Sequence, residues 1–89
     1  MGIKGEWDVK SSETGVYLIL LDAVPSEHWI EEFLEKWEYE RQRRSNTLEP
    51  LGEVEIVGDQ IRIKEPRPPR LNSEAWQKPL ALQIIESIP

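Results

Sequence analysis

The amino-acid sequence predicts an α+β fold in which one long helix packs on an antiparallel or mixed β-sheet of four to five strands. A sustained helical period runs over residues 26–44 only, and short apolar or alternating segments lie on both sides of it. The length of 89 residues suffices for one domain, 1–89. Four tryptophans, nine isoleucines and nine leucines can supply its core.

The helix is expected to begin near Ser26 and to end near Arg44. Ser26 is a suitable N-cap, and Glu27 in the first turn suits the positive end of the helix dipole. The arginines in the last turn suit the negative end. Five apolar side chains fall within an arc of roughly 140° at about 100° per residue, and we expect this stripe to face the sheet. They are Trp29, Ile30, Phe33, Leu34 and Trp37.

Two strands are predicted before the helix, over residues 3–10 and 16–23. The second, VYLILLDA, is the most apolar run of the chain. Its nearly continuous apolarity predicts burial on both faces and a central position in the sheet. The turn-rich residues 11–15 lie between the two segments, and Gly15 can adopt the positive φ that such a loop often needs, so a hairpin is expected.

Residues 53–64, EVEIVGDQIRIK, predict a second hairpin with a two-residue turn at Gly58 and Asp59. In this register one face consists of Val and Ile, and the other carries two pairs of opposite charge. A shift by one residue would expose the isoleucines, so the register is well determined. The predicted pairs are Val57–Gln60, Ile56–Ile61, Glu55–Arg62, Val54–Ile63 and Glu53–Lys64.

The C-terminal third predicts a connector, a short helical turn and a last strand. The proline-rich residues 66–70 favour an extended connector, and residues 73–76 favour a helical turn that Pro79 interrupts. Residues 80–88 alternate as a strand does, although Leu80, Ile84 and Ile88 also match one helical face. Their β-branched content favours the strand. The resulting β-β-α-β-β-(short α)-β order is close to a ferredoxin-like arrangement with an added N-terminal strand.

Composition and motifs exclude several kinds of chemistry. The absence of cysteine excludes disulfides, thiolate metal sites and a cysteine nucleophile. The single histidine, His28, excludes a histidine-based metal site within one chain, and we expect it to be exposed to solvent. The helix glutamates are expected to form its wet face. Phosphate-binding loops, HExxH and serine-centred elbows are absent, so we predict no enzymatic activity, cofactor or metal.

The charge balance predicts the class of partner. Seventeen acidic and eleven basic residues give a net charge of −6. Such a surface is repelled by phosphate backbones and anionic membranes, which disfavours nucleic acid and membranes as partners and suits a basic protein. The sequence also shows neither a signal peptide nor a membrane-spanning run. A soluble, cytoplasmic protein is therefore expected.

The end of the long helix predicts an interaction surface. The apolar stripe stops at Trp37, and the arginine-rich stretch that follows it, with an aromatic residue nearby, has the composition of a protein interface. The proline–arginine connector offers a second, polyproline-like route. The candidate partner-binding residues are Tyr39, Arg41, Arg43, Arg44, Leu48, Arg67 and Arg70.

Together these features predict a small acidic protein–protein interaction module, such as an inhibitor, an adaptor or an accessory subunit. The first alternative is a homo-oligomeric small-ligand or regulatory domain, in which a sheet edge pairs with its twin in a homodimer. The second is RNA binding through the arginine clusters, to which Lys64 also belongs.

Overall fold

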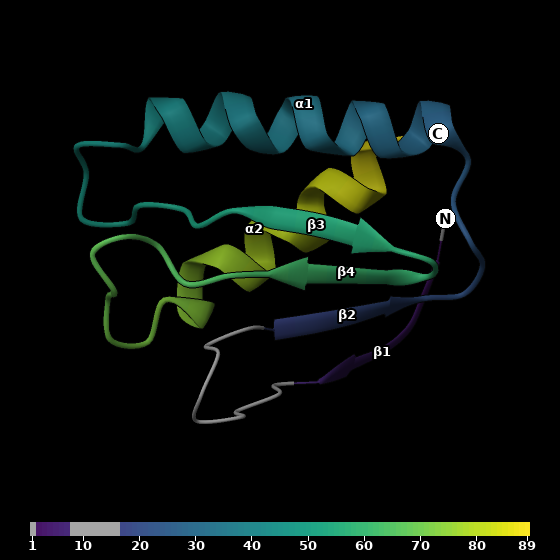
Figure 1. The fold of residues 1–89 in the computed structure, drawn as a ribbon, viewed down its shortest axis with the longest axis horizontal. Coiled ribbons are helices and arrows are strands. Elements are labelled where there is room, and N and C mark those ends of the chain that lie inside the picture. Colours follow the sequence, from purple (N-terminus) through teal and green to yellow (C-terminus); the bar gives the residue numbers. More distant parts are fainter. Residues whose placement is uncertain (1, 8–16) are drawn as a thin grey trace.

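The computed structural model describes residues 2–7 and 17–89, which form one antiparallel sheet and two helices. The strands follow the order β1-β2-β4-β3 in the sheet. Helix α2 crosses behind the sheet, and α1 runs beside β3 in the opposite direction (Figure 1). In chain order the elements are β1 (Ile3–Trp7), β2 (Tyr17–Leu21), α1 (Glu27–Arg43), β3 (Val54–Val57), β4 (Gln60–Ile63) and α2 (Glu74–Ser87).

The C-terminal segment corrects the prediction. Residues 80–88 were expected to form a strand, but α2 continues to Ser87, so the order is β-β-α-β-β-α and neither the ferredoxin-like order nor the single long helix is confirmed. Pro79 does not end the helix, because it removes only the bond to the carbonyl of Ala75, and both residues lie on the exposed side. The buried positions follow a helical period: Gln77, Leu80, Ala81, Ile84 and Ile85.

The β3–β4 hairpin has the predicted register, from Val57–Gln60 to Val54–Ile63. Gly58 lies in its turn with a φ of 61°, a conformation that glycine adopts without steric cost. Of the two predicted charge pairs, Glu55 and Arg62 form an ion pair at 3.7 Å. At the other position the link runs through the backbone: the amide of Lys64 donates to the carbonyl of Glu53 at 2.8 Å.

Strand β2 is central, as predicted, but only one of its faces is buried. Tyr17, Ile19 and Leu21 point into the core, whereas Leu18 and Leu20 are partly exposed. The expectation of burial on both faces was wrong, because in the part of the chain described both helices contribute to the core on the same side of the sheet. The open face is the one seen in Figure 1.

Strand β1 pairs antiparallel with β2, which confirms the pairing of the two predicted N-terminal strands. The register is irregular between Ile3 and Gly5. The end of the predicted first strand and the predicted turn at residues 11–15, with Gly15, lie outside the described residues.

Helix α1 begins as predicted, since the Ser26 hydroxyl accepts a hydrogen bond from the amide of Trp29 at 3.2 Å. The rings of Trp29, Phe33 and Trp37 stack in sequence, with centroids 5.6 and 6.2 Å apart, and all three are buried. The predicted stripe is therefore correct at its centre. At its margin, Ile30 is half-buried and Leu34 is exposed.

Residues 50–52, called the clamped segment here, lead from α1 towards β3 and are held by both helices. The indole nitrogen of Trp37 donates to the carbonyl of Gly52 at 2.9 Å, and that of Trp76 donates to the carbonyl of Pro50 at 2.8 Å. The amide of Gly52 donates to the buried side-chain oxygen of Gln77 at 2.7 Å. The segment passes so close to the next strand that a Cβ atom on Gly52 would overlap the carbonyl oxygen of Lys64.

A second polar contact joins β2 to the start of α2. The Tyr17 hydroxyl donates to the Glu74 carboxylate at 2.7 Å and lies 3.2 Å from the hydroxyl of the buried Ser73. Burial raises the pKa of Tyr17 to about 12, and its hydrogen bond to Glu74 acts in the same direction, whereas the contact with Ser73 opposes it. Ser73 makes no side-chain cap bond to the helix, because its backbone is helical (φ −59°, ψ −23°) rather than extended as at Ser26.

Candidate functional site

The described residues form no cluster suited to binding a metal ion. Within residues 2–7 and 17–89, no group of three or more His, Asp or Glu side chains could hold a metal ion. In the same ranges no helix has the length and apolarity needed to cross a bilayer. His28 is exposed, as predicted, and its Nε2 lies 3.5 Å from the Glu32 carboxylate. The surface grooves and the apolar side chains therefore carry the functional argument.

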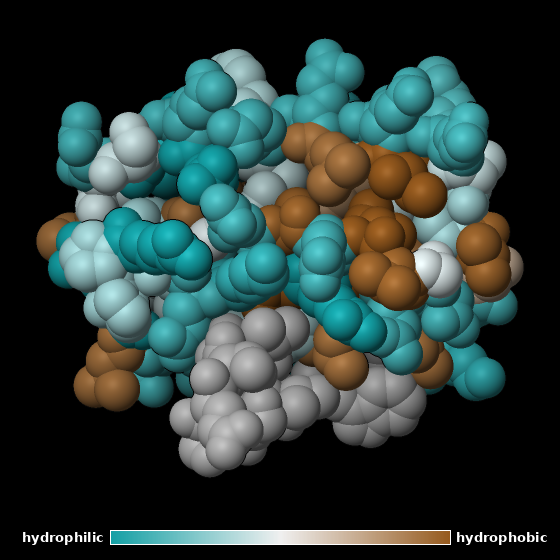
Figure 2. Space-filling model, viewed as in Figure 1, coloured by the Kyte–Doolittle hydropathy of each residue, from teal (hydrophilic) through white to brown (hydrophobic). Residues whose placement is uncertain are grey.

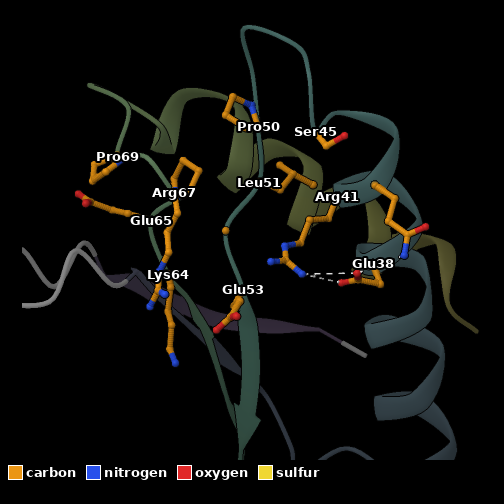
Figure 3. A pocket seen from close by; sticks show the side chains of 13 residues that line it. Glu38, Arg41, Ser45, Pro50, Leu51, Glu53, Lys64, Glu65, Arg67 and Pro69 are labelled. Carbon is orange, nitrogen blue, oxygen red and sulfur yellow. Dashed lines mark hydrogen bonds and ion pairs between the residues drawn. The ribbon is translucent and has the colours of Figure 1, made fainter.

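Two of the predicted partner-binding residues, Arg41 and Arg67, meet in a cleft of about 600 Å³. The cleft lies between the C-terminal half of α1, the clamped segment and the residues that follow β4 (Figure 3). In Figure 3 Arg41 reaches in from α1, while Lys64 and Arg67 lie across from it on the far side of the clamped segment. The fold thus brings one arginine of the first basic cluster to the same cleft as Lys64 and Arg67 of the second.

The cleft has no excess of positive charge. Its cations are Arg41, Lys64 and Arg67, and its carboxylates are Glu38, Glu53 and Glu65. Arg41 and Glu38 form an ion pair at 3.2 Å. No carboxylate of the described residues lies within 4 Å of Lys64 or Arg67, yet the equal number of acids and bases gives the cleft no net preference for phosphate.

Tyr39 lies on a different surface, the groove between α1 and α2. Its side chain is 68% exposed, and the groove, of about 670 Å³, has the nearly buried Leu80 and Ile84 along its α2 side. Glu32 and Glu35 of α1 also line it. The sequence placed Tyr39 near the arginines, but the helix turns its side chain away from the cleft.

The remaining predicted residues lie where α1 ends, except Arg70, which is exposed in the connector. Arg43 pairs with Glu40 at 2.9 Å, and Arg44 lies 3.8 Å from Glu40 and 3.6 Å from Glu49. These ion pairs neutralise the positive charge of the two arginines locally. Leu48 is 90% exposed in the loop and borders the same hollow as the two arginines.

An apolar surface that the sequence did not predict lies between α1 and β3. Figure 2 shows apolar side chains gathered there, beside the open face of the sheet. Leu34 is 37% and Val57 47% exposed, and three neighbouring aliphatic side chains, Ile30, Val54 and Ile56, are partly buried. This surface, called the apolar strip below, consists of Ile30, Leu34, Val54 and Ile56, and it ends at Val57, which alternation along β3 places on the open face of the sheet.

A small hollow connects the apolar strip to the cleft. It has a volume of about 300 Å³, and its apolar lining is Leu34, Trp37 and Val54. Its other lining residues, Glu38, Arg41 and Glu53, also line the cleft. The strip and the cleft therefore form one continuous surface along the side of α1, apolar towards Val57 and charged towards Arg41.

A single signal for this surface is present in the sequence: Ile30 and Leu34 lie at one margin of the apolar arc of α1. Periodicity shows that such residues are apolar and adjacent to the buried stripe. It does not show whether the sheet extends far enough to cover them. Here β3 is the edge strand, so the sheet ends beside α1 and the margin stays accessible.

Comparison of the chain with protein-family models, with curated proteins and with solved structures found no significant match. We therefore infer its function from the residues of this chain and from the surfaces that its fold builds.

Proposed function

We propose that this protein is a small, non-enzymatic protein–protein interaction module whose main contact surface is the apolar strip. The observation that carries the proposal is the exposure of Leu34 and Val57 beside three partly exposed aliphatic side chains of α1 and β3. Contiguous apolar surface of this kind marks interaction sites in soluble proteins. An inhibitor, adaptor or accessory subunit, acting in the cytoplasm, would use such a surface.

The neighbouring cleft completes the anatomy of an interface. Protein interfaces commonly have an apolar centre and a polar rim, and arginine is enriched in them. Arg41 lies at the end of the strip, and Arg67 lies across the cleft from it. Two of the residues predicted from the sequence thus belong to the rim of the proposed surface.

The clamped segment supports the proposal by holding the floor of the cleft. Its backbone is hydrogen-bonded to the side chains of Trp37, Trp76 and Gln77, so both helices fix its position. A surface that is ordered before binding loses less conformational entropy when the partner arrives.

The alternatives have less support. RNA binding requires an excess of positive charge, whereas Arg41, Arg43 and Arg44 are ion-paired to glutamates and the cleft contains equal numbers of acids and bases. Pairing of sheet edges in a homodimer requires an accessible edge strand. Helix α1 runs along one edge strand, β3 (Figure 1). In the described sheet this leaves the other edge strand, β1, for such pairing.

The test is affinity capture of partners from the native lysate, with and without nuclease, followed by quantitative mass spectrometry. The bait proteins are the wild type, Leu34→Lys in the strip and Leu48→Lys in the exposed loop. We expect one stoichiometric partner that survives nuclease, is retained by Leu48→Lys and is lost with Leu34→Lys. Unchanged capture by Leu34→Lys would show that the strip is not the contact surface, and loss with nuclease would favour RNA.

A second substitution separates loss of binding from loss of folding. Leu34 is partly buried, so Leu34→Lys removes some packing, whereas Val57 is more exposed and lies at the end of β3. Val57→Lys should reduce capture in the same way. The far-UV circular dichroism and the melting temperature of each variant provide the folding control.

A further inference from the structure

We infer that the partner contributes a basic amphipathic segment, whose apolar side chains cover the strip while its Lys or Arg side chains lie over the N-terminal half of α1. The inference rests on the proposed function and adds the chemistry of the partner. It depends on the charges that border the strip.

The first border is a row of glutamates on α1. At about 100° per residue, Glu27, Glu31 and Glu38 fall within an arc of roughly 40°, next to Leu34 and on the side away from the buried stripe. All three are exposed. The helix thus presents a row of aliphatic side chains followed by a row of carboxylates.

The second border lies on the strand side. Glu55 in β3 and Glu53 just before it are exposed, with their side chains on the open face of the sheet, as alternation along the strand requires. The strip therefore has carboxylates along both of its long sides. A partner segment lying in the strip would have acidic groups on both sides, from α1 and from β3.

Local cations compensate only some of these carboxylates. Glu38 pairs with Arg41, and Glu55 pairs with Arg62. For Glu27, Glu31 and Glu53, no cation of the described residues lies within 4 Å. An incoming ammonium or guanidinium group would therefore gain an interaction without having to displace an existing one.

The distribution of charge along the strip gives the segment a direction. The first nine residues of α1, 27–35, contain four glutamates and neither Lys nor Arg. The opposite end opens into the cleft, where three cations balance three carboxylates, so this end has no excess of negative charge. The basic side chains of the partner should therefore lie at the end marked by Glu27 and Glu31, which is next to Val57 at the end of β3 (Figure 1).

The same charges disfavour a second copy of this chain as the occupant. Two strips placed face to face would bring carboxylate rows together, and each chain carries a net charge of −6. Like charges brought close at an interface are repulsive, and the desolvation of acidic side chains adds to the cost. A heterologous, basic segment meets neither difficulty.

The experiment is a titration of the ¹⁵N-labelled protein with two synthetic peptides of about 14 residues, designed as amphipathic helices. One consists of Leu and Lys, the other of Leu and Glu in the same pattern. We expect the Lys peptide to produce saturable shifts in the amides of Ile30, Leu34 and Val54–Val57. The Glu peptide should produce none, and added salt should weaken the binding of the Lys peptide.

Two charge-matched variants test the role of the border. Glu27→Gln with Glu31→Gln removes two carboxylates from the strip, and Glu32→Gln with Glu35→Gln removes two from the α1–α2 groove on the same helix. Both change the net charge equally, so long-range attraction is the same. The first should weaken binding of the Lys peptide at least about fivefold, and the second less than about twofold.

The outcomes separate the two proposals. Equal binding of both peptides to the strip, or equal effects of the two double variants, would overturn the basic segment while the strip remains a contact surface. If neither peptide shifts strip amides, the basic segment is likewise overturned, and the capture experiment with Leu34→Lys then decides whether the strip binds a partner of other chemistry. Shifts confined to the α1–α2 groove would also overturn the inference.

Discussion

The loop between α1 and β3 contains two adjacent regions that use polar contacts in opposite ways. Residues 44–49 are mostly exposed and are held by surface ion pairs and by the hydroxyl of Thr47, which donates to the carbonyl of Arg44 at 2.8 Å. The clamped segment that follows is buried and bonded by two indoles and an amide side chain. Water can replace the contacts of the first region but not those of the second, so the two should differ greatly in their contribution to stability.

The largest effect is expected from Gly52→Ala. The new methyl group would overlap the carbonyl oxygens of Lys64 and Glu65, and the hydrogen bonds on both sides of Gly52 prevent the backbone from moving away. We expect a loss of about 3 kcal/mol or more in the free energy of unfolding, measured by urea denaturation. The control is Gly58→Ala, which meets no atom within 4 Å and should cost about 1 kcal/mol through its positive φ alone.

Gln77→Leu should come next. The substitution keeps the approximate volume but leaves the amide of Gly52 without its acceptor in a buried position. An unsatisfied buried donor costs about 1–3 kcal/mol. Gln83→Leu, on the exposed side of the same helix, should stay within about 0.5 kcal/mol of the wild type in the same denaturation experiment. Similar losses in both variants would contradict the role of the clamp.

Tyr17 provides a pH-dependent test outside the loop. Its pKa is raised to about 12 in the folded protein, so the unfolded chain ionises first, near its ordinary value of 10. The stabilising contribution is therefore fully present below pH 10 and is lost as the pH rises from 10 towards 12. Urea midpoints of the wild type and of Tyr17→Phe should converge over this window. A constant difference between pH 9 and pH 12 would contradict the assignment.

The smallest effect is expected from Arg43→Ala in the first region. Arg43 pairs with Glu40 at 2.9 Å, but its side chain is exposed, and exposed pairs within one helix contribute about 0.3–0.5 kcal/mol. We expect a change in unfolding free energy within about 0.5 kcal/mol, and 0.5 M salt should reduce it further. A loss comparable with that of Gln77→Leu would remove the distinction between the two regions.

The elements that the sequence predicted well are those whose signals are local. Helix α1 has a cap at Ser26, a stacked aromatic row and a charge bias, and each of these acts within a few residues. The β3–β4 register follows from a two-residue turn at Gly58 and from alternation on either side of it. Neither prediction required knowledge of the rest of the chain.

The features that the sequence did not predict depend on distant parts of the chain. The apolar residues in 80–88 match both a strand period and a helical period. The helix is favoured only because it packs these residues against the sheet. The clamp requires Trp37, Trp76 and Gln77 to reach one segment from two helices, which no spacing in the sequence indicates. Tyr39 and Arg41 are close in sequence, but the turn of α1 places their side chains on different surfaces. The apolar strip depends on where the sheet ends.

The clamped segment also determines how the protein should open. Trp37 lies in the first half of the chain and Gln77 in the second, and both bond to Gly52, so neither half can complete its buried hydrogen bonds without the other. Local fluctuations that release α1 or α2 alone would break this shared contact. The Gly52 amide should therefore exchange its hydrogen only when the whole described fold unfolds, which makes the two helices members of one cooperative unit.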